Sequence, residues 1–521
     1  MSVKPTSFSI QINQQSCTVN AQQTVASALA IHAQGQTRCS PTGQQRAPLC
    51  GMGICQECRV SINGQPHQLA CQTYCQPGMQ VSNQSIALPN AETQPRPNKQ
   101  AFDVVVIGAG PGGQAAALAA VRQGRRVALV DDNPLPGGQI WRAAQHSPSQ
   151  QPQATQSWAQ VAAQTNITWL AAHKLVQVLP ERGLVLQAAD GHSPHLQYQE
   201  LILATGARER LLPFPGWTLP GVTGLGGLQA LAKGGYPLQG KRVVLAGSGP
   251  LLLAVAATLR QRGAQVLCIL EQTSRAQLWR FASGLWATPS KLWQAAGLGR
   301  QLLGIPYHSN SYVVAALPTV DGQQLGAVRL QIGSKQVEME CDYVACAYGL
   351  LPNTRLAQAL GCALQNENEA DAVAVNQQQA TSQAHIWCVG EACGIGGVDK
   401  ARIEGEIAGL AACGQNTQHL QADRQRWQNF SARLAQAFAL RAEVKQLATP
   451  ETIICRCEDV SLAQITPFSD WRSAKLQTRC GMGACQGLVC GSALQSLRGW
   501  QVDGMRAPFS PCRIASFLEE A

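Results

Sequence analysis

The first sixty residues contain two short apolar patterns, separated by a stretch in which apolar residues show no regular spacing. Residues 8–12 alternate between apolar and polar side chains, which predicts a half-buried strand. A short helix is predicted over residues 24–33. Residues 59–62 predict a second strand, and it leads into Asn63-Gly64, a dipeptide typical of tight hairpin turns. We therefore expect a long irregular loop between the helix and the hairpin.

A strand, a turn and a helix are predicted from residue 104 onward. Residues 104–107 are consecutive apolar side chains, which predict a buried strand, and residues 114–123 predict a helix that ends at Gly124. Another strand is predicted over residues 126–130, directly before Asp131. This order of elements predicts a βαβ unit.

A second unit of the same kind is predicted further along the chain. The longest apolar run, residues 243–259, is interrupted by Gly247, Gly249 and Pro250. It therefore predicts a strand, a turn and a helix, and not a membrane span. A strand over residues 265–270 follows.

Several shorter elements complete the pattern. We expect strands within residues 174–187, a buried strand over residues 201–203 and a helix over residues 400–412. A stripe of large apolar residues at helical spacing then predicts core packing or domain docking, and not a cofactor contact. The stripe consists of Trp427, Phe430, Leu434 and Phe438.

Composition narrows the class of protein. The 521 residues are enough for three or four domains. The formal net charge of +10 comes from scattered basic residues, without a basic run interleaved with aromatic side chains, which argues against a nucleic-acid partner. The first 15 residues lack the apolar core of a signal peptide. We therefore expect a cytoplasmic protein without a transmembrane segment, with docking at the inner face of a membrane through a complex as an option.

Twenty cysteines are unusual for the cytoplasm, and their grouping predicts that metal holds many of them. Cys50, Cys55 and Cys58 have the spacing Cys-x4-Cys-x2-Cys, and Cys71 follows after the hairpin. This is the plant-type ferredoxin spacing for a [2Fe-2S] cluster. The alternatives are spare buried thiols or a zinc site, although zinc sites usually pair two short Cys-x2-Cys units.

A second group of cysteines lies near the end of the chain. Cys455 and Cys457 are followed by Cys480, Cys485 and Cys490. Five thiols for four ligand places predict a second cluster with one cysteine left over. Spacing alone does not choose among them, and a zinc ribbon remains the alternative.

The turn after residue 107 carries a dinucleotide-binding fingerprint. Gly108, Gly110 and Gly113 have the spacing Gly-x-Gly-x-x-Gly, which permits a tight turn, a close approach to a pyrophosphate and close packing of strand against helix. Asp131 is placed to accept hydrogen bonds from a ribose.

The second βαβ unit repeats this fingerprint imperfectly. Gly247 and Gly249 are present and Glu271 ends the second strand, but Leu252 replaces the third glycine. The helix should therefore stand further off. Two interpretations are equally supported here. The unit is either a site for NAD or a related nucleotide, or a duplicated scaffold without a ligand.

These motifs resemble the FAD-dependent alpha subunits of hydrogen cyanide synthase, opine oxidases and dye-linked amino-acid dehydrogenases. The resemblance rests on the glycine fingerprint and on PGGQI, ATGARER, PFPGWTLPGV, AGSGPLLLAVAA and VGEACGIGG, and it extends over nearly the whole chain. The same pattern occurs in the alpha chain of heterotetrameric sarcosine oxidase. The resemblance implies that FAD is held by Gly108, Gly110, Gly113, Asp131, Gln139, Thr205, Gly206, Gly390 and Glu391.

Both ends of the chain carry further resemblances. The N-terminal region is similar to the small [2Fe-2S] subunit of hydrogen cyanide synthase, and the C-terminal region is similar to the bacterioferritin-associated ferredoxin domain. The latter similarity implies the ligands Cys455, Cys457, Cys485 and Cys490, with Cys480 as a spectator. Neither nucleotide motif has a neighbouring cysteine pair, in contrast to disulfide reductases of similar fold.

The implied fold class is α/β, with two Rossmann-like dinucleotide-binding units, an N-terminal β-grasp [2Fe-2S] domain and a small C-terminal [2Fe-2S] domain. We predict a ferredoxin-like domain over 1–88, a linker over 89–100, an FAD/NAD(P)-binding domain over 101–414 with motifs at 104–131 and 243–271, a helical connector over 415–449 and a cluster domain over 450–521.

The implied activity is that of an oxidoreductase acting on CH-NH or CH-NH2 donors as part of a complex. A glycine-oxidase-like beta subunit with its own FAD would oxidise the substrate, and this chain would pass electrons through FAD and two clusters to a quinone or another carrier. FMN at a subunit interface is a further candidate cofactor. No catalytic acid-base residue is predicted, since none of the nine histidines lies in a recognisable constellation.

Two other functions remain open at the level of sequence. In the first, the chain is a self-contained NADH-dependent reductase, and Glu271 in the second motif favours the 2′-hydroxyl of NADH. In the second, it is a redox sensor or scaffold that catalyses nothing.

Overall fold

The computed structural model describes residues 7–83, 99–142, 151–367, 370–502 and 505–517. The chain folds into two compact units that alternate along the sequence. Unit 1 comprises Met1–Asn90, Glu209–Gly349 and Ala437–Asp503, and unit 2 comprises Ala91–Arg208, Leu350–Gln436 and Gly504–Ala521. Most of the predicted linker over residues 89–100 lies outside the described residues, and strand β8 begins at Lys99.

A seven-stranded sheet forms the centre of unit 2, in the order β10-β9-β8-β13-β12-β11 with β26 paired to β13. Strands β10, β9, β8, β13 and β26 are parallel, whereas β11 and β12 are antiparallel additions. The bounds are β8 (Lys99–Ile107), β9 (Val127–Val130), β10 (Ile167–Leu170), β11 (Lys174–Leu179), β12 (Gly183–Gln187), β13 (His195–Leu203) and β26 (Ile386–Cys388). The predicted first βαβ unit is therefore present, with its glycine turn at the carboxyl end of β8.

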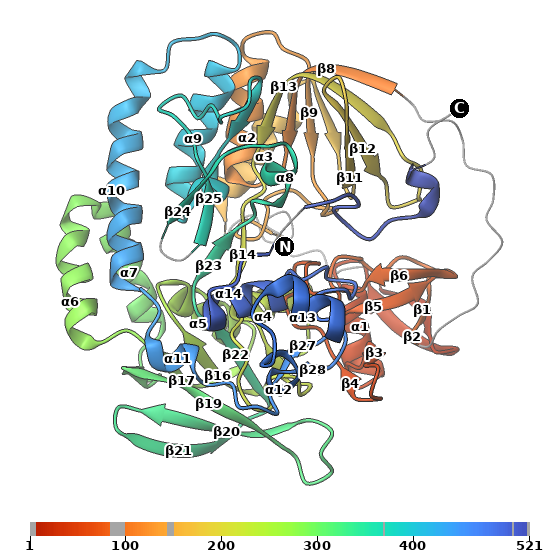
Figure 1. Cartoon of the computed structure of the whole chain (residues 1–521), viewed down its shortest axis with the longest axis vertical. Helices are drawn as coiled ribbons and strands as arrows, with labels where there is room; N and C mark the ends of the chain where they lie inside the picture. Colours follow the sequence, from red (N-terminus) through yellow and green to blue (C-terminus); the bar gives the residue numbers. More distant parts are fainter. Residues whose placement is uncertain (1–6, 84–98, 143–150, 368–369, 503–504, 518–521) are drawn as a thin grey trace. The chain divides into compact units, whose positions relative to one another are not determined.

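Helices of unit 2 cover this sheet, and Figure 1 shows α2 and α9 side by side. Pro111 starts α2 three residues earlier than the sequence predicts, because proline is favoured at the first helical position. The other elements are α2 (Pro111–Val121), α3 (Pro152–Ala162), β23 (Leu350–Pro352), α8 (Arg355–Ala359), β24 (Leu364–Glu367), β25 (Ala370–Val373), η4 (Gly390–Cys393), α9 (Val398–Ala411), η5 (Gln418–Leu420) and η6 (Ile514–Phe517).

The second predicted βαβ unit forms the central sheet of unit 1. Its five strands have the order β15-β22-β16-β17-β18 and are all parallel. A three-stranded antiparallel sheet, β19-β20-β21, follows. The bounds are β15 (Val222–Thr223), α4 (Leu225–Lys233), β16 (Arg242–Gly247), α5 (Leu251–Gln261), β17 (Gln265–Glu271), α6 (Arg275–Ser283), η3 (Gly284–Ala287), α7 (Pro289–Gln301), β18 (Tyr307–Ser309), β19 (Ser311–Pro318), β20 (Leu325–Ile332), β21 (Lys335–Glu340) and β22 (Tyr343–Ala347).

The N-terminal part of unit 1 is a mixed five-stranded sheet in the order β2-β1-β7-β5-β6, with one helix, α1. Side chains of α1 and of α4 share one hydrophobic core. The Ser27 hydroxyl donates to the Gly234 carbonyl at 2.6 Å and fixes this packing. The bounds are β1 (Ser7–Ile12), β2 (Gln15–Asn20), α1 (Val25–His32), β3 (Arg38–Cys39), β4 (Gln45–Arg46), β5 (Arg59–Ile62), β6 (Gln65–Leu69) and β7 (Gln80–Ser82).

The last part of unit 1 is a small helical region around a short hairpin. Its core contains Trp471, Ile454 and Leu494 together with cysteines. The bounds are α11 (Ala442–Lys445), β27 (Ile453–Cys455), β28 (Val460–Ser461), α12 (Leu462–Ile465), α13 (Trp471–Thr478) and α14 (Cys490–Arg498). The chain first passes from unit 2 into unit 1 through β14 (Ala207–Glu209). It later passes from unit 2 into this helical region through α10 (Gln421–Ala437).

The predicted apolar stripe on α10 divides into two parts. Trp427 and Phe430 are buried, with their rings 5.8 Å apart in an edge-to-face arrangement, as expected for core packing. Phe438 lies just beyond the end of the helix and has a different environment. None of the helices in the described part of the chain is long and apolar enough to cross a bilayer.

Candidate cofactor sites

The four N-terminal thiols that the sequence predicts as ligands are all buried. The structure brings them together in two pairs, since the thiol of Cys50 is hydrogen-bonded to Cys55 and that of Cys58 to Cys71. The loop that carries Cys50 and Cys55 has no regular structure, as expected. The arrangement fits a cluster held by four thiolates.

Backbone N-H groups of this loop point at the sulfurs. Met52 N and Cys55 N donate to Cys50 Sγ at 3.5 and 3.3 Å, and Glu57 N donates to Cys55 Sγ at 3.5 Å. Burial raises the pKa of Cys50, but the hydrogen bonds from Cys55 and from the backbone outweigh it and lower the pKa overall. Such donors stabilise thiolate charge, as a metal cluster requires.

The loop lies tightly against α4. Gly51 has φ of +59°, and a Cβ atom there would lie 2.5 Å from the carbonyl oxygen of Gly227. Any side chain at Gly51 would therefore push the cysteine loop off the helix.

The C-terminal cysteines also form two groups. The sulfurs of Cys455, Cys480 and Cys490 lie within 4.8 Å of one another, and all three side chains are buried. Cys457 is hydrogen-bonded to Cys485. Hydrogen bonds from Cys480 and Cys490 lower the pKa of Cys455 to about 3, so this sulfur is the preferred thiolate of the group.

The first group joins Cys455 to two later cysteines, Cys480 and Cys490, and the second joins Cys457 to Cys485. Cys480, expected to be a spectator, thus lies directly beside two of the four ligands that the resemblance implies. The choice of four ligands among the five thiols stays a prediction.

Serine substitutions test whether Cys480 differs in role from the predicted ligands. We expect Cys485→Ser to remove one of the two clusters, because Cys457 then loses its thiol neighbour. Cys480→Ser should keep both clusters, because four paired thiols remain. Iron content and the electron paramagnetic resonance spectrum of the reduced protein are the readouts. Equal iron loss in both variants would contradict the assignment.

A buried ion-pair network joins the two cysteine loops within unit 1. Glu57, between Cys55 and Cys58, accepts a hydrogen bond from Arg456 Nε at 2.9 Å. Arg456 stands between Cys455 and Cys457, and the side chains of Glu57 and Arg456 are only 1% and 3% exposed.

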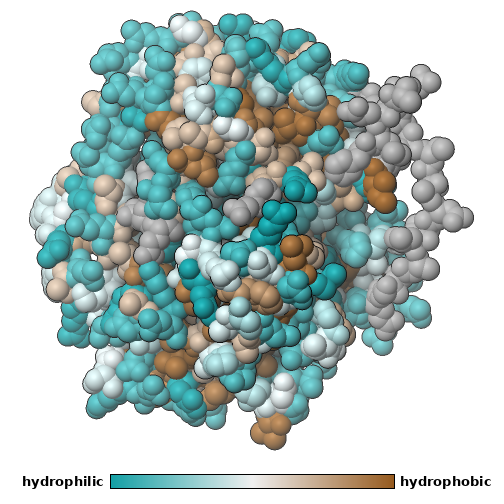
Figure 2. Space-filling model, in the orientation of Figure 1, coloured by the Kyte–Doolittle hydropathy of each residue, from teal (hydrophilic) through white to brown (hydrophobic). Residues whose placement is uncertain are grey.

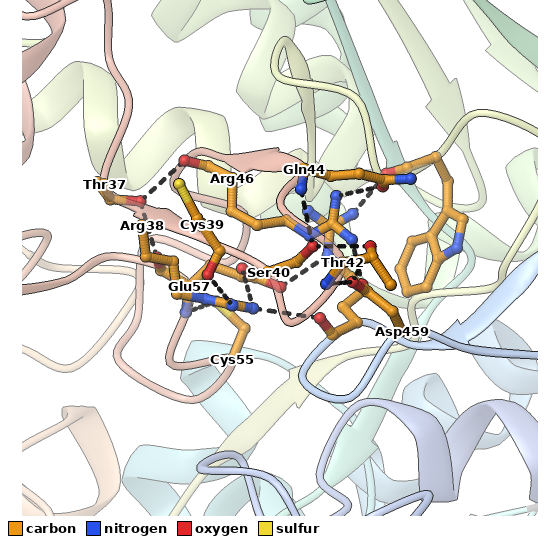
Figure 3. A network of polar contacts seen from close by, with 12 residues as sticks. Thr37, Arg38, Cys39, Ser40, Thr42, Gln44, Arg46, Cys55, Glu57 and Asp459 are labelled. Carbon is orange, nitrogen blue, oxygen red and sulfur yellow. Dashed lines mark hydrogen bonds and ion pairs between the residues drawn. The ribbon is translucent and has the colours of Figure 1, made fainter. Parts of the chain in front are cut away.

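The pair is held from several sides. Arg38 Nη2 makes a second ion pair with Glu57 at 2.9 Å, as Figure 3 shows. The guanidinium of Arg456 lies over the ring of Trp217, 5.0 Å from its centre, and donates to the Trp217 carbonyl. The Glu57 carboxylate therefore faces two cations and needs both for its burial.

A second contact of the same network lies close by (Figure 3). Arg46 pairs with Asp459, and these side chains are 1% and 2% exposed. Asp459 also accepts from the Thr42 hydroxyl at 2.6 Å. Burial raises the pKa of Asp459, but the hydrogen bonds from Ser40 and Thr42 and the charge of Arg46 lower it overall. Both loops are thus fixed to each other at two points.

The first glycine fingerprint has the geometry that a nucleotide turn needs. A Cβ atom at Gly113 would lie 1.8 Å from the Gly108 carbonyl oxygen, so only glycine permits this packing. At Gly110 the nearest atom is Gly138 Cα, 3.9 Å from the position of a Cβ, which leaves room in front of the helix N-terminus. Asp131 directly follows β9 and accepts from Ala109 N at 2.6 Å.

Other predicted flavin residues lie near open space or carry an unused polar atom. Oε1 of Gln139 is buried and has no hydrogen-bond partner within the described structure. No atom lies within 4 Å of a Cβ position at Gly206, and the preceding Thr205 donates to the Asn353 carbonyl at 2.7 Å. These residues fit a polar ligand such as a flavin nucleotide.

The turn that carries Gly390 and Glu391 is fixed by a buried ion pair that the sequence did not reveal. Lys400 and Glu404, one turn apart on α9, pair at 3.0 Å and are 5% and 2% exposed. Lys400 Nζ donates to the Gly394 carbonyl at 2.9 Å, and Glu404 accepts from Gly390 N at 2.9 Å. Glu391 Oε1 accepts from Gly397 N at 3.0 Å, so the expected ligand contact competes with the chain's own backbone.

The second fingerprint has a similar backbone but a different surrounding. Gly249 N donates to Glu271 Oε2 at 2.7 Å, which parallels Ala109 and Asp131. Leu252, in place of the third glycine, is fully buried in the core. The ring of Phe438 lies 3.8 Å from the Cβ position of Gly249, whereas the neighbour of Gly110 is backbone, with Gly138 Cα at 3.9 Å.

The segment around Phe438 is also hydrogen-bonded to this turn. Ser248 donates to the Phe438 carbonyl at 3.3 Å, and the buried Gln272 donates to the Ala439 carbonyl at 2.9 Å. Arg441 N in turn donates to Gln272 Oε1 at 3.0 Å. A stretch of the chain's own backbone therefore covers the second glycine turn.

Comparison with known proteins adds to this geometry. A family model described as pyridine nucleotide-disulphide oxidoreductase matches residues 102–405, and one described as 2Fe-2S iron-sulfur cluster binding domain matches residues 6–86. An opine oxidase subunit of Agrobacterium tumefaciens is 30% identical over 462 residues, which are 80% of this chain and 91% of that protein. The hydrogen cyanide synthase subunit HcnB of Pseudomonas aeruginosa is 32% identical over 426 residues, 74% of this chain and 90% of that protein.

A solved structure is similar over the whole length. L-proline dehydrogenase from P. horikoshii superposes with a TM-score of 0.71 at 16% sequence identity, and the match covers 100% of this chain and 99% of that chain. At this identity the similarity supports the fold alone.

Proposed function

We propose that the chain is the electron-transfer, alpha-type subunit of a dehydrogenase complex. It belongs to the pyridine nucleotide-disulphide oxidoreductase family, in the group that contains the opine oxidase and hydrogen cyanide synthase subunits described above. It is an FAD- and 2Fe-2S-dependent oxidoreductase. The proposed electron donors are compounds with CH-NH or CH-NH2 groups, such as amino acids, glycine or opines.

One observation carries the electron-transfer role: the buried pair of Glu57 and Arg456 holds the two cysteine loops against each other. Cys55, Cys485 and the partly buried Cys457 also pack in one hydrophobic cluster. Two redox sites in contact within one unit are suited to moving electrons between them.

The residues supply binding, orientation and exclusion of water. When bound, FAD exchanges two electrons and a [2Fe-2S] cluster one, so together they connect a two-electron donor to a one-electron acceptor. Gly110 and the N-terminus of α2 would receive the pyrophosphate, and Gln139 offers an unused acceptor. The thiols of the two loops would hold iron, and the N-H donors of the N-terminal loop would stabilise the Cys50 thiolate.

The remaining assignments follow from the resemblance. The small C-terminal region would bind the second [2Fe-2S] cluster, and a flavin-containing beta subunit would provide the substrate pocket, with FMN at the subunit interface as an option. The acceptor would be a quinone or another carrier. We place the complex in the cytoplasm, with peripheral association at the inner face of the membrane as an option.

Substituting valine for Gly110 tests the flavin site. Valine would fill the space in front of α2, so Gly110→Val should abolish FAD binding while both clusters assemble. Flavin and iron content of the purified protein check this. The matched control is Gly124→Asn, at a residue with φ of +76° in the same βαβ unit and no atom within 4 Å of its Cβ position. A Gly110→Val protein with full FAD would refute the assignment.

The runner-up, a self-contained NADH-dependent reductase, requires an open second glycine turn. Phe438 and Ala439 cover that turn, since Ser248 donates to the Phe438 carbonyl and Gln272 donates to the Ala439 carbonyl. We therefore propose that Gly247, Gly249 and Glu271 form a scaffold and bind no NAD.

One experiment separates these functions. The chain is purified anaerobically, with and without a co-purifying flavoprotein, and flavin absorbance is followed after adding NADH and then amino acids or opines. Reduction by an amino acid or opine only when the second flavoprotein is present supports the proposed function. Reduction by NADH alone would establish a reductase. Failure of every donor, even with the partner, would favour a sensor or scaffold.

A further inference from the structure

One helical segment of unit 1 exposes an unusual set of side chains. We call residues 275–307, which comprise α6, η3, α7 and the turn up to Tyr307, the tryptophan hairpin. Trp279, Trp286 and Trp293 are 76%, 77% and 77% exposed, and Leu303 is 70% exposed. No residue of α6 or α7 is buried. The hairpin therefore presents large apolar side chains that the fold of unit 1 does not use.

Figure 1 shows α6 and α7, in green, as neighbouring helices outside the central sheet of unit 1. The surface over α6 is largely pale in Figure 2. On α7, Trp293, Ala296, Gly297 and Arg300 follow helical spacing, and all four are exposed. One face of α7 thus combines an aromatic ring, small residues and a cation.

The charge of the hairpin has a single sign. No aspartate or glutamate occurs between Glu271 and Asp321. This interval contains four basic residues, and the chain as a whole has 40 basic and 30 acidic residues. The basic residues of the hairpin are Arg275, Arg280, Lys291 and Arg300.

We propose that the tryptophan hairpin docks the protein on the surface of an anionic lipid bilayer. Tryptophan prefers the boundary between headgroups and acyl chains, where its ring is buried and its N-H stays hydrated. Basic residues nearby are attracted to anionic headgroups. Short helices with this composition lie in the interface and do not span it.

Charge decides between a lipid surface and a protein partner. Protein interfaces also favour aromatic residues and arginine, but their buried core is depleted in charged residues and their rim is polar. Here every charge along the hairpin is positive, which matches a uniformly anionic surface. Docking would bring the protein to the place where lipid-soluble electron acceptors are found, but it does not depend on the identity of the donor or on the proposed function.

Flotation with lipid vesicles tests the proposal on the purified complex. Wild-type protein should float with vesicles of phosphatidylglycerol and phosphatidylcholine and remain at the bottom with phosphatidylcholine alone. The triple variant W279S/W286S/W293S should lose flotation. The variant R275Q/R280Q/K291Q/R300Q should bind the anionic vesicles about a hundredfold more weakly than the wild type. Both variants should keep wild-type flavin and iron content, which shows that they are folded.

The control replaces exposed apolar residues elsewhere in unit 1. V320S/V337S/L476S changes side chains that are 111%, 41% and 62% exposed and should float like the wild type. Failure of the wild type to float with either kind of vesicle would overturn the proposal. So would a triple tryptophan variant that floats normally but loses a co-purifying protein, because the hairpin would then be a protein interface. Flotation needs no electron donor, so its outcome is independent of the dehydrogenase assay.

Discussion

Replacing Glu57 by glutamine is expected to lower the free energy of unfolding of unit 1 by about 3–5 kcal/mol. The substitution keeps the shape of the side chain but removes its charge. Arg456, 3% exposed, and Arg38, 11% exposed, would then be cations without their carboxylate partner. Both cysteine loops would lose a support, so the affinity for iron should fall about 10- to 100-fold at each site.

Unfolding followed by cluster absorbance, together with iron content, measures this effect. The matched control is Glu338→Gln, because Glu338 pairs with Arg329 at 2.8 Å on the surface, where the side chains are 56% and 42% exposed. Because water screens this surface pair, Glu338→Gln should lower the free energy of unfolding by about 1 kcal/mol or less. If both glutamine variants were equally stable, the buried pair would not hold the loops together. If iron were lost at the N-terminal site alone, Glu57 would act only on its own loop.

Replacing Lys400 by methionine should have a comparable effect on unit 2. Glu404 would be left as a buried carboxylate without a cation, at a cost of about 3–5 kcal/mol. The carbonyl groups of Gly390 and Gly394 would lose their donor as well. Because this turn carries two predicted flavin residues, FAD content should fall together with stability.

The pH dependence identifies the cause of this effect. Burial raises the pKa of Glu404 even though Lys400 opposes it, so removing Lys400 should raise that pKa further. The buried Glu404 carboxylate lowers the free energy of unfolding only when it is ionised. This loss of stability is therefore absent below the ordinary glutamate pKa of about 4.3 and complete above the raised pKa of the folded state. The stability deficit of Lys400→Met should therefore be large at pH 8 and shrink towards pH 4.

A double variant provides the control for this prediction. K400M/E404Q replaces the ion pair by two neutral side chains of similar size, so its deficit should be smaller than that of Lys400→Met and nearly independent of pH. Melting temperatures across this pH range check both variants. A single variant whose deficit does not change with pH would show that lost packing, and not an unpaired charge, is responsible.

Local patterns were sufficient to find the two βαβ units and the first nucleotide turn. The strand at residues 126–130 and the buried strand at residues 201–203 are present, as β9 and within β13. Gly113 has the close contact with Gly108 that its place in the fingerprint predicts. These features depend on neighbours in sequence, which hydrophobic period and glycine spacing describe.

The contacts that distinguish this protein are between residues far apart in sequence. Glu57 and Arg456 are separated by 399 positions, and each occupies an unspecified position of its cysteine motif. Their place directly beside cysteine ligands was a signal, because a charged residue in a buried metal loop requires a partner. Phe438 continues a helical stripe in sequence, yet α10 ends at Ala437 and the ring lies at the second glycine turn. The sequence pattern could not show where the helix would end.

The separation of Arg46 and Glu57 from their partners has a consequence for biosynthesis. Arg46 leaves the ribosome 413 residues before Asp459, and at about 5–20 residues per second this interval lasts about 20–80 s. During that time Arg46 lacks its carboxylate partner Asp459, and Glu57 lacks Arg456. We expect the nascent loop to stay open until translation is nearly complete, so that iron delivery to both sites takes place on the finished chain.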